Sequence, residues 1–176
     1  RFPWNTALLR NTEVQTLLLD ATPPIMELRS LLANLIQIPE ANYQVAAQVS
    51  AMDVHYAPDP EAPPHPLNGK RLKDLPLKLK DGQLMNSYSF LNKGHFLLLN
   101  FHVKEQNSGQ WATYSHLQVV HASLVEAEAD WNDVHSVLIR PDGHVAWAIS
   151  RSDPNPMQTI SEGIARWCGN ITNQEK

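Results

Sequence analysis

The sequence contains a single cysteine, Cys168, so it forms no internal disulfide, no CxxC redox pair and no zinc site built on paired cysteines. Its seven glycines never lie close enough together to form GxG, GxGxxG or GxxxxGK, which removes the nucleotide- and flavin-binding fingerprints. The longest apolar run, Val145 to Ile149, is far shorter than the about 20 residues of a membrane span. Basic residues form no run, and 14 basic against 18 acidic residues give no electrostatic footprint for nucleic acid. We therefore expect neither nucleic acid nor a membrane as a partner.

What the sequence does contain is typical of a globular protein. It has 176 residues, 43% of them apolar, and a chain of this size buries roughly 68–70% of its unfolded surface without help from disulfides or metals. The lone thiol is compatible with a reducing cytosol, and we expect a cytoplasmic protein. The sequence begins at Arg1, without an initiator methionine or the apolar region of a signal peptide, within an ongoing helical pattern. We expect it to be a piece of a longer protein.

Three helices are predicted in residues 1–56. Thr6 to Leu19 has apolar residues on one side, although polar residues interrupt the stripe. From Pro24 to Ile36 apolar residues recur at steps of three and four, with Thr22 as a candidate N-cap. Pro39 opens a third helix that ends near Ala51. Amphipathic helices need a surface to cover, so this helical segment is expected to pack on further polypeptide.

A proline-rich linker is predicted at residues 57–66, where five prolines favour an extended connection. After it the apolar period changes to that of strands. Leu75 to Leu84 forms a hairpin around Asp81-Gly82, and Phe96 to Phe101 and Leu117 to Val120 are two buried strands. Gln110 to His116 is predicted to supply a helix between them, completing a βαβ unit.

The rest of the chain predicts a short helix, a hairpin and a final helix. The short helix covers about Leu124 to Trp131, and the strands Val134–Ile139 and Val145–Ile149 are joined by a bulged turn at Arg140–His144. Asp153 or Asn155 caps a helix from Met157 to Trp167, with Gly169 at its C′ position, and residues 171–176 are a frayed tail. The order predicts an α/β fold: a thioredoxin-like domain over residues 67–170, with a central mixed sheet, βαβ then ββα, preceded by the helical segment.

Several stretches resemble one family. SVLIRPDGHVAWAIS and the helix SEGIARWCG resemble the C-terminal end of FAD-dependent aromatic-ring hydroxylases, the phenol hydroxylase-like and polyketide hydroxylase-like flavoprotein monooxygenases. LNGKRLKDLPLKLKDGQ is similar to the entry hairpin of that domain, PEANYQVAAQVSAMDVHY to the segment leading into it, and LLRNTEVQTLLL to an earlier family helix. Four loose patterns in the family's order are more specific than any one alone. Ala148 stands where arginine is common in the family, so a role of that arginine is not carried over.

The resemblance implies the C-terminal part of a monooxygenase that hydroxylates an aromatic or polyketide-like ring with NAD(P)H and O₂. It also implies that the helical segment, residues 1–56, is the end of the flavin- and substrate-binding part of that enzyme. FAD and NAD(P)H are implied for the parent protein, and no cofactor, catalytic residue or metal is assigned to this chain. The implied partner is the N-terminal flavin-binding part of the same protein, with a homo-oligomer as a further option. The sequence lacks the CxxC and the cis-proline of thioredoxins, at His102–Trp111 and Asn132-Asp133, which favours a non-redox domain.

Alternatives remain open from the sequence. The main one is a stand-alone, redox-inactive thioredoxin-like module that binds a protein or a small ligand; another is a thiol enzyme acting through Cys168 alone. His116, His121 and either His102 or His135 are considered as metal ligands without supporting spacing, and Ser136, His144 and Asp142 as a triad without a GxSxG elbow. Candidate interface residues are Trp4, Trp111, Arg140 and Asp142.

Overall fold

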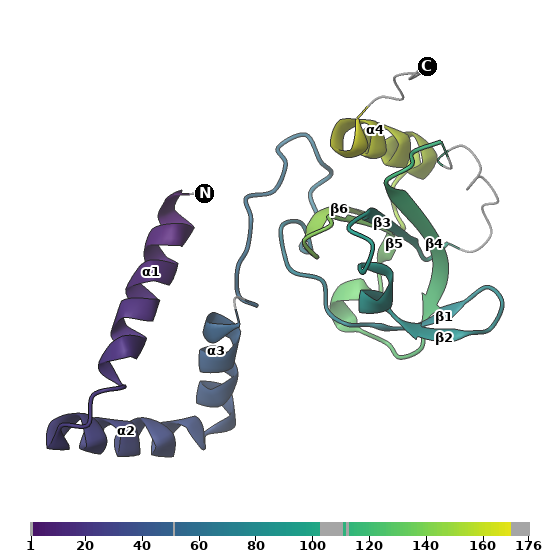
Figure 1. Cartoon of the computed structure of the whole chain (residues 1–176). Coiled ribbons are helices and arrows are strands. Elements are labelled where there is room, and N and C mark those ends of the chain that lie inside the picture. Colours follow the sequence, from purple (N-terminus) through teal and green to yellow (C-terminus); the bar gives the residue numbers. More distant parts are fainter. Residues whose placement is uncertain (1, 51, 103–110, 112, 170–176) are drawn as a thin grey trace. The chain divides into compact units, whose positions relative to one another are not determined.

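The computed structural model describes residues 2–50, 52–102, 111 and 113–169, and side chains from Leu9 onward except Asn11 (Figure 1). The chain divides into two compact units, Arg1–Asp53 and Val54–Lys176. Within the described residues, no helix has the length and apolar character needed to cross a bilayer.

The first unit consists of three helices: α1 (Phe2–Leu17), α2 (Pro23–Ile36) and α3 (Pro39–Val49). All three were predicted, and α2 and α3 begin at prolines, whose fixed φ and missing N–H suit the first turn of a helix. No described side chain of this unit is buried. The described helix surfaces of this unit are therefore apolar in part, and no described side chain of it forms a buried core.

The second unit contains a six-stranded mixed sheet in the order β2-β1-β4-β3-β5-β6 (Figure 1). Its strands are β1 (Pro76–Leu79), β2 (Leu84–Asn86), β3 (Phe96–Asn100), β4 (Leu117–Leu124), β5 (Val134–Ile139) and β6 (Val145–Ser150), and a single long helix, α4 (Pro156–Cys168), follows them. Only β3 and β4 run parallel among these paired strands; the remaining neighbours are antiparallel. The predicted α/β fold class with its central mixed sheet is confirmed.

The core lies on both faces of this sheet because alternate residues of the central strands point to opposite sides. Leu97 and Leu99 belong to one apolar cluster, whereas Leu98 belongs to the other, which α4 covers through Ile160 and Ile164. All five residues are completely buried. This placement explains why β3 reads as a continuous apolar run rather than an alternating one.

Two predicted helices are wrong in the structure. Residues 124–131 begin inside β4, because β1 pairs with that strand as far as Leu77↔Leu124, and only a 3₁₀ turn, Ala129–Trp131, follows. In the predicted crossover helix, Gln110 and Ala112 lie outside the described residues. The described remainder forms successive turns, in which Tyr114 N–H donates to Trp111 O and Leu117 N–H to Tyr114 O. The apolar spacing there reflects burial of Trp111 and Leu117, not a helix face.

The proline-rich segment, residues 57–66, belongs to the second unit and contacts it; we call it the proline arm. A turn interrupts it, in which Ala62 N–H donates to Asp59 O at 3.0 Å. Asn68 Nδ2 donates to Pro63 O at 2.7 Å, while Asn68 Oδ1 accepts the Ala148 N–H of the edge strand β6 at 2.8 Å. One buried side chain thus fastens the arm, at Pro63, to the sheet.

Candidate functional site

The turn between β5 and β6 is the centre of a polar and aromatic cluster in the second unit. Arg140 N–H donates to His144 O, Gly143 N–H donates to Arg140 O, and Gly143 has a φ of 82°. Pairing shifts register beside the turn at Leu138/Ile139, which confirms the predicted bulged hairpin. The turn therefore holds the side chains of residues 140–144 in defined directions.

Arg140 and Asp142, two of the candidate interface residues, contact each other and the surrounding unit. The Arg140 guanidinium pairs with the Asp142 carboxylate and lies over the Tyr56 ring, 4.5 Å from its centroid, and 6.0 Å from that of Trp167. Asp142 also accepts the His144 N–H at 3.2 Å. Arg140 thereby connects the turn with the residue preceding the proline arm and with α4. The two side chains are 23% and 42% exposed, so part of each still faces solvent.

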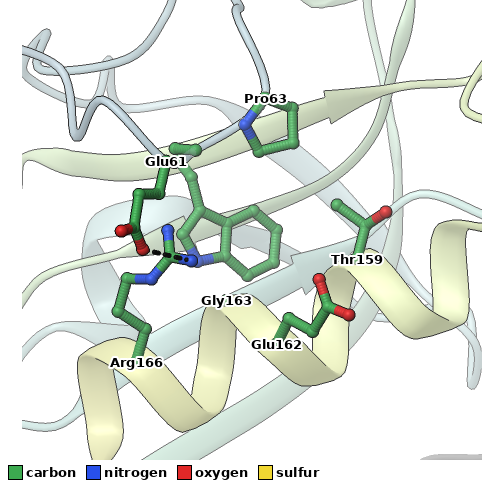
Figure 2. Close-up of a pocket in the computed structure, with 8 residues that line it drawn as sticks. Glu61, Pro63, Thr159, Glu162, Gly163 and Arg166 are labelled. Atoms are coloured by element: carbon green, nitrogen blue, oxygen red, sulfur yellow. Dashed lines mark ion pairs between the residues drawn. The ribbon is translucent and has the colours of Figure 1, made fainter.

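A pocket of about 240 Å³ lies between the proline arm and α4 (Figure 2). Figure 2 shows Glu61 and Pro63 of the arm on one side and Thr159, Glu162, Gly163 and Arg166 of α4 on the other. The remaining lining residues are Ala62, which belongs to the arm, and Trp147, which belongs to β6. Charged and hydroxyl groups on an apolar indole floor suit binding of a small polar group, but the lining has no cysteine or histidine that would serve as a nucleophile or base.

Arg166 joins the walls of this pocket by pairing with two carboxylates. Its Nη1 lies 3.2 Å from Asp59 Oδ2 and its Nη2 lies 2.8 Å from Glu61 Oε2. The pKa of Asp59 is lowered from its usual 3.8, most strongly by the backbone N–H of Glu61. Desolvation opposes this as the next-largest effect, and Arg166 and the Trp167 indole lower the pKa further. A backbone N–H of the arm and two side chains of α4 therefore favour the ionised form of this carboxyl.

The floor of the pocket depends on a glycine in the middle of α4. A Cβ built at Gly163 would lie 2.5 Å from Trp147 Nε1 and 2.6 Å from Cε2. Such contacts are shorter than real Cβ contacts, so only glycine lets α4 approach the indole this closely. An isolated glycine inside a helix is a signal of close packing, but the sequence does not show that the residue packed against Gly163 is Trp147.

The structure places the two candidate interface tryptophans differently. Trp111 is 3% exposed and packs in the cluster of Leu98, Leu138 and Trp147, so it belongs to the core. An interface role of Trp111 stays a prediction. Trp4 lies in α1, and its side chain is outside the described ones.

The histidines considered as metal ligands do not gather into one site. His102 and His135 stack with centroids 5.0 Å apart, but His116 Nε2 pairs with Cys168 O at 2.9 Å, at a separate place. The pKa of His121 is lowered, chiefly by desolvation and further by Lys80. No group of three or more His, Cys, Asp or Glu within the described part of the chain is arranged to hold a metal ion.

Neither nucleophile considered from the sequence is placed for catalysis. Ser136 pairs with Ile149 in mid-hairpin and its Oγ lies 2.9 Å from His135 Nδ1, whereas His144 and Asp142 lie in the turn. Cys168 is buried at the end of α4, and burial raises its pKa from 9.0 to about 11. Its thiol therefore stays protonated at neutral pH.

Sequence reasoning missed the residues that organise the site around Arg140 and α4: Tyr56, Asp59, Glu61, Asn68, Trp147 and Arg166. They come from three segments far apart in the chain. The sequence offered one signal for these contacts, which is the opposite charge of the two segments. The proline arm carries the acidic residues Asp59 and Glu61, and the last turn of α4 carries the basic residue Arg166. This opposite charge does not specify that they meet.

The fold and its site define an α/β domain in which a mixed sheet carries a C-terminal helix and a docked proline arm. The family model described as aromatic-ring hydroxylase, C-terminal, matches residues 65–170. The chain belongs to this family.

Relatives and solved structures agree with this assignment. An uncharacterized aromatic compound monooxygenase, YhjG, of Bacillus subtilis (strain 168) is 45% identical over 167 residues, which are 95% of this chain and 33% of that protein. Anhydrotetracycline monooxygenase of Streptomyces rimosus is 30% identical over 171 residues, 96% of this chain and 33% of its own length.

Two solved structures resemble the chain over nearly its whole length. OxyS anhydrotetracycline hydroxylase from Streptomyces rimosus matches with a TM-score of 0.71 and 28% identity, over 96% of this chain and 34% of its own. CabE, an aromatic hydroxylase from angucycline biosynthesis, matches with a TM-score of 0.68 and 30% identity, over the same shares. The chain thus spans about a third of the length of these relatives.

Proposed function

We propose that this chain is the C-terminal part of an FAD-dependent monooxygenase that hydroxylates an aromatic or polyketide-like substrate with NAD(P)H and O₂. The observation that carries the proposal is the family match over residues 65–170. Relatives named as monooxygenases of aromatic compounds and of anhydrotetracycline support the kind of reaction. The FAD and NAD(P)H requirement is inferred from the resemblance of the sequence segments to flavoprotein hydroxylases.

Within that enzyme, this part has a structural and interface-forming role. The described residues do not fit FAD: the glycines with positive φ lie in separate turns, at Gly69, Gly82, Gly94, Gly143 and Gly169, rather than in one loop leading into a helix. FAD and the nicotinamide are therefore assigned to polypeptide outside this chain, and no chemical step to its residues.

The proposed partner of the helical unit is the flavin-binding part of the same protein. On α2, Leu28, Leu31 and Leu35 are 42%, 57% and 45% exposed. An apolar stripe of this kind gains stability when it is covered. Association with another copy of the chain is the competing arrangement.

A chimeric enzyme tests the proposal. The matching third of the Bacillus subtilis relative is replaced by this chain, and bound flavin and NAD(P)H oxidation are measured with a panel of phenols and polycyclic aromatics. We expect the chimera to retain FAD and to couple nicotinamide oxidation to ring hydroxylation, and the isolated chain to leave FAD fluorescence unquenched. Stoichiometric FAD binding by the isolated chain would overturn the non-catalytic assignment. A folded chimera without flavin would contradict the proposed parent enzyme.

The second candidate is a stand-alone, redox-inactive module that binds a protein or a small ligand. The observation in its favour is that the second unit has a complete core on both sheet faces and a polar pocket. A self-contained module stays monomeric at every concentration, whereas an uncovered α2 stripe drives association. Sedimentation velocity over a wide dilution series distinguishes the two.

A further inference from the structure

A second polar feature lies at the outer edge of β6, where residues 69–72 pair with the β5–β6 turn. Val145 N–H donates to Lys70 O at 2.8 Å and Leu72 N–H donates to Gly143 O at 2.9 Å, and these two bonds flank the antiparallel bridge Arg71↔His144. Arg71 and His144 are thus a non-hydrogen-bonded pair, the type in which opposite side chains lie closest, about 4.5 Å apart at Cα. Both side chains leave the backbone on the same face, next to each other.

Both side chains have buried nitrogens without a partner. Arg71 Nε and both ring nitrogens of His144 are buried and make no hydrogen bond to the described part of the chain. His144 as a residue is only 5% exposed, while Arg71 is half-buried and so extends to solvent. A guanidinium keeps its charge at every relevant pH, and a buried charged donor is costly unless something accepts its hydrogen bonds.

The surroundings of this pair carry an excess of positive charge. Arg140 lies over the Tyr56 ring, and Tyr56 packs edge-on against His144 with centroids 4.7 Å apart. The nearby carboxylate, Asp142, is engaged by Arg140 and by the His144 N–H, and its Oδ1 lies 3.4 Å from His144 Nδ1 without forming a hydrogen bond there. No ion pair reaches Arg71 from any described residue. Asp142 is therefore matched by Arg140, and Arg71 is left without a counter-charge.

We propose that Arg71 and His144 form a binding site for an oxyanion, either a carboxylate or a phosphate. The guanidinium of half-buried Arg71 presents its fork of N–H donors to two oxygens of the anion, and the His144 ring lies next to it on the same face. Carboxylates and phosphates both have the paired oxygens that a guanidinium binds, so the proposal covers both classes of anion. The site is separate from the pocket between the proline arm and α4, since neither residue lines that pocket.

Residue-resolved titration of the full 176-residue chain tests the proposal. Sodium phosphate and sodium acetate are added in separate series to ¹⁵N-labelled protein, with sodium chloride keeping the ionic strength constant. The Arg71 Nε–Hε and His144 ring signals are followed by NMR. We expect a saturating shift of both residues with at least one anion, and the anion that saturates at lower concentration identifies the preferred class. Shifts that fail to saturate with either anion, or that spare Arg71 and His144, overturn the proposal.

Variants separate this site from general attraction of anions to a basic surface. Arg71→Gln should weaken the binding by about tenfold or more, as loss of a charge-assisted bidentate contact predicts. Lys93→Gln removes a cation from an exposed loop and should leave the affinity unchanged. Equal weakening in the two variants contradicts a specific site. Arg71→Lys keeps the charge without the fork; if Arg71→Gln does not fold, full affinity in Arg71→Lys contradicts bidentate binding.

Discussion

At the scale of single residues, Gly163 shows how a local cost serves tertiary packing. Glycine in a helix interior is about 1 kcal/mol less favourable than alanine, yet here it admits the Trp147 indole at distances that a Cβ forbids. The neighbour is a rigid, fully buried ring rather than the end of a flexible side chain. The residue that is poorest for α4 as a helix is thus the one that its packing against β6 requires.

We therefore predict that Gly163→Ala destabilises the protein, against its gain in helix propensity. Forcing α4 away from Trp147 is expected to cost about 1–3 kcal/mol net in the free energy of unfolding, the range for overpacking of a core. Urea denaturation followed by tryptophan fluorescence measures it. Glu162→Ala, at the adjacent exposed position, is the control and should stay within about 0.5 kcal/mol of the parent. A stabilised Gly163→Ala variant would show that α4 does not approach β6 as described.

A second residue-scale prediction concerns the thiol of Cys168. Burial raises its pKa from 9.0 to about 11, so the folded protein holds this proton more tightly than the unfolded chain. Between pH 9 and 11 the unfolded state loses the proton first, and stability falls as the pH rises through this window. In the variant Cys168→Ser, the free energy of unfolding should not show this decrease between pH 9 and 11.

Reactivity gives an independent check on Cys168. We expect slow reaction with a disulfide reagent at pH 8 in the native state and fast reaction in denaturant, because the thiolate is the nucleophile. Rapid labelling of the native protein would revive the reading of a thiol enzyme acting through Cys168 alone.

At the scale of elements, the sequence predicted correctly those structures that depend only on residues close together in the chain. The hairpin turns at Asp81-Gly82 and at Arg140–His144 were predicted from residues whose backbone preferences act within four positions, and both glycines adopt the positive φ expected. The predicted helix at residues 124–131 failed because pairing with β1 extends β4, a contact that is remote in sequence. The pairing of β1 with β4 therefore determined the structure at the start of this segment, against its local helical pattern.

The sequence did not predict that the proline arm packs against the second unit, because the contacts that hold it also join residues far apart in the chain. Its composition indicates an extended backbone, but what holds it is an ion pair between Asp59 and Arg166, 107 positions apart, and the two hydrogen bonds of Asn68. Neither partner carries a local signal of the other. Of the candidate interface residues, Arg140 and Asp142 were recognisable as turn residues, but their contacts with Tyr56 and His144 required the fold.

We predict that the arm is held by this ion pair in a pH-dependent way. Because the pKa of Asp59 lies below 3.8 in the folded state, its contribution is present above pH 3.8 and is lost as the pH falls through the folded-state value. Arg166 is 36% exposed on its side chain, so solvent screening limits the coupling to about 0.2–1 kcal/mol.

A double-mutant cycle of Asp59→Asn and Arg166→Gln measures this coupling from thermal unfolding at pH 7 and again at acid pH. Glu126→Gln, which neutralises an exposed acid of another loop, controls for net charge. Coupling that persists unchanged below the folded-state pKa of Asp59 would assign the effect to packing and not to charge.

At the scale of the whole molecule, the two units differ in what stabilises them. The second unit buries apolar side chains on both faces of its sheet. Eleven of them are at 0% exposure: Leu77, Leu97, Leu98, Leu99, Val134, Val137, Leu138, Ile139, Ala148, Ile160 and Ile164. The first unit has three helices of 16, 14 and 11 residues and no buried described side chain. Helices of this length are marginal in water unless packing supports them.

The last prediction follows from that contrast. A fragment comprising Val54–Lys176 should unfold in one cooperative thermal transition close to that of the full chain, since the contacts of its core lie within it. Residues 1–53 alone should show little helix by circular dichroism at low concentration and gain helix as concentration rises, because their apolar stripes are then covered by other copies. Substituting Leu31 and Leu35 of α2 with glutamine should abolish that concentration dependence. A helical, monomeric 1–53 fragment would mean that the first unit is stable by itself, and the proposal that it packs on the flavin-binding part of a larger enzyme would lose its physical basis.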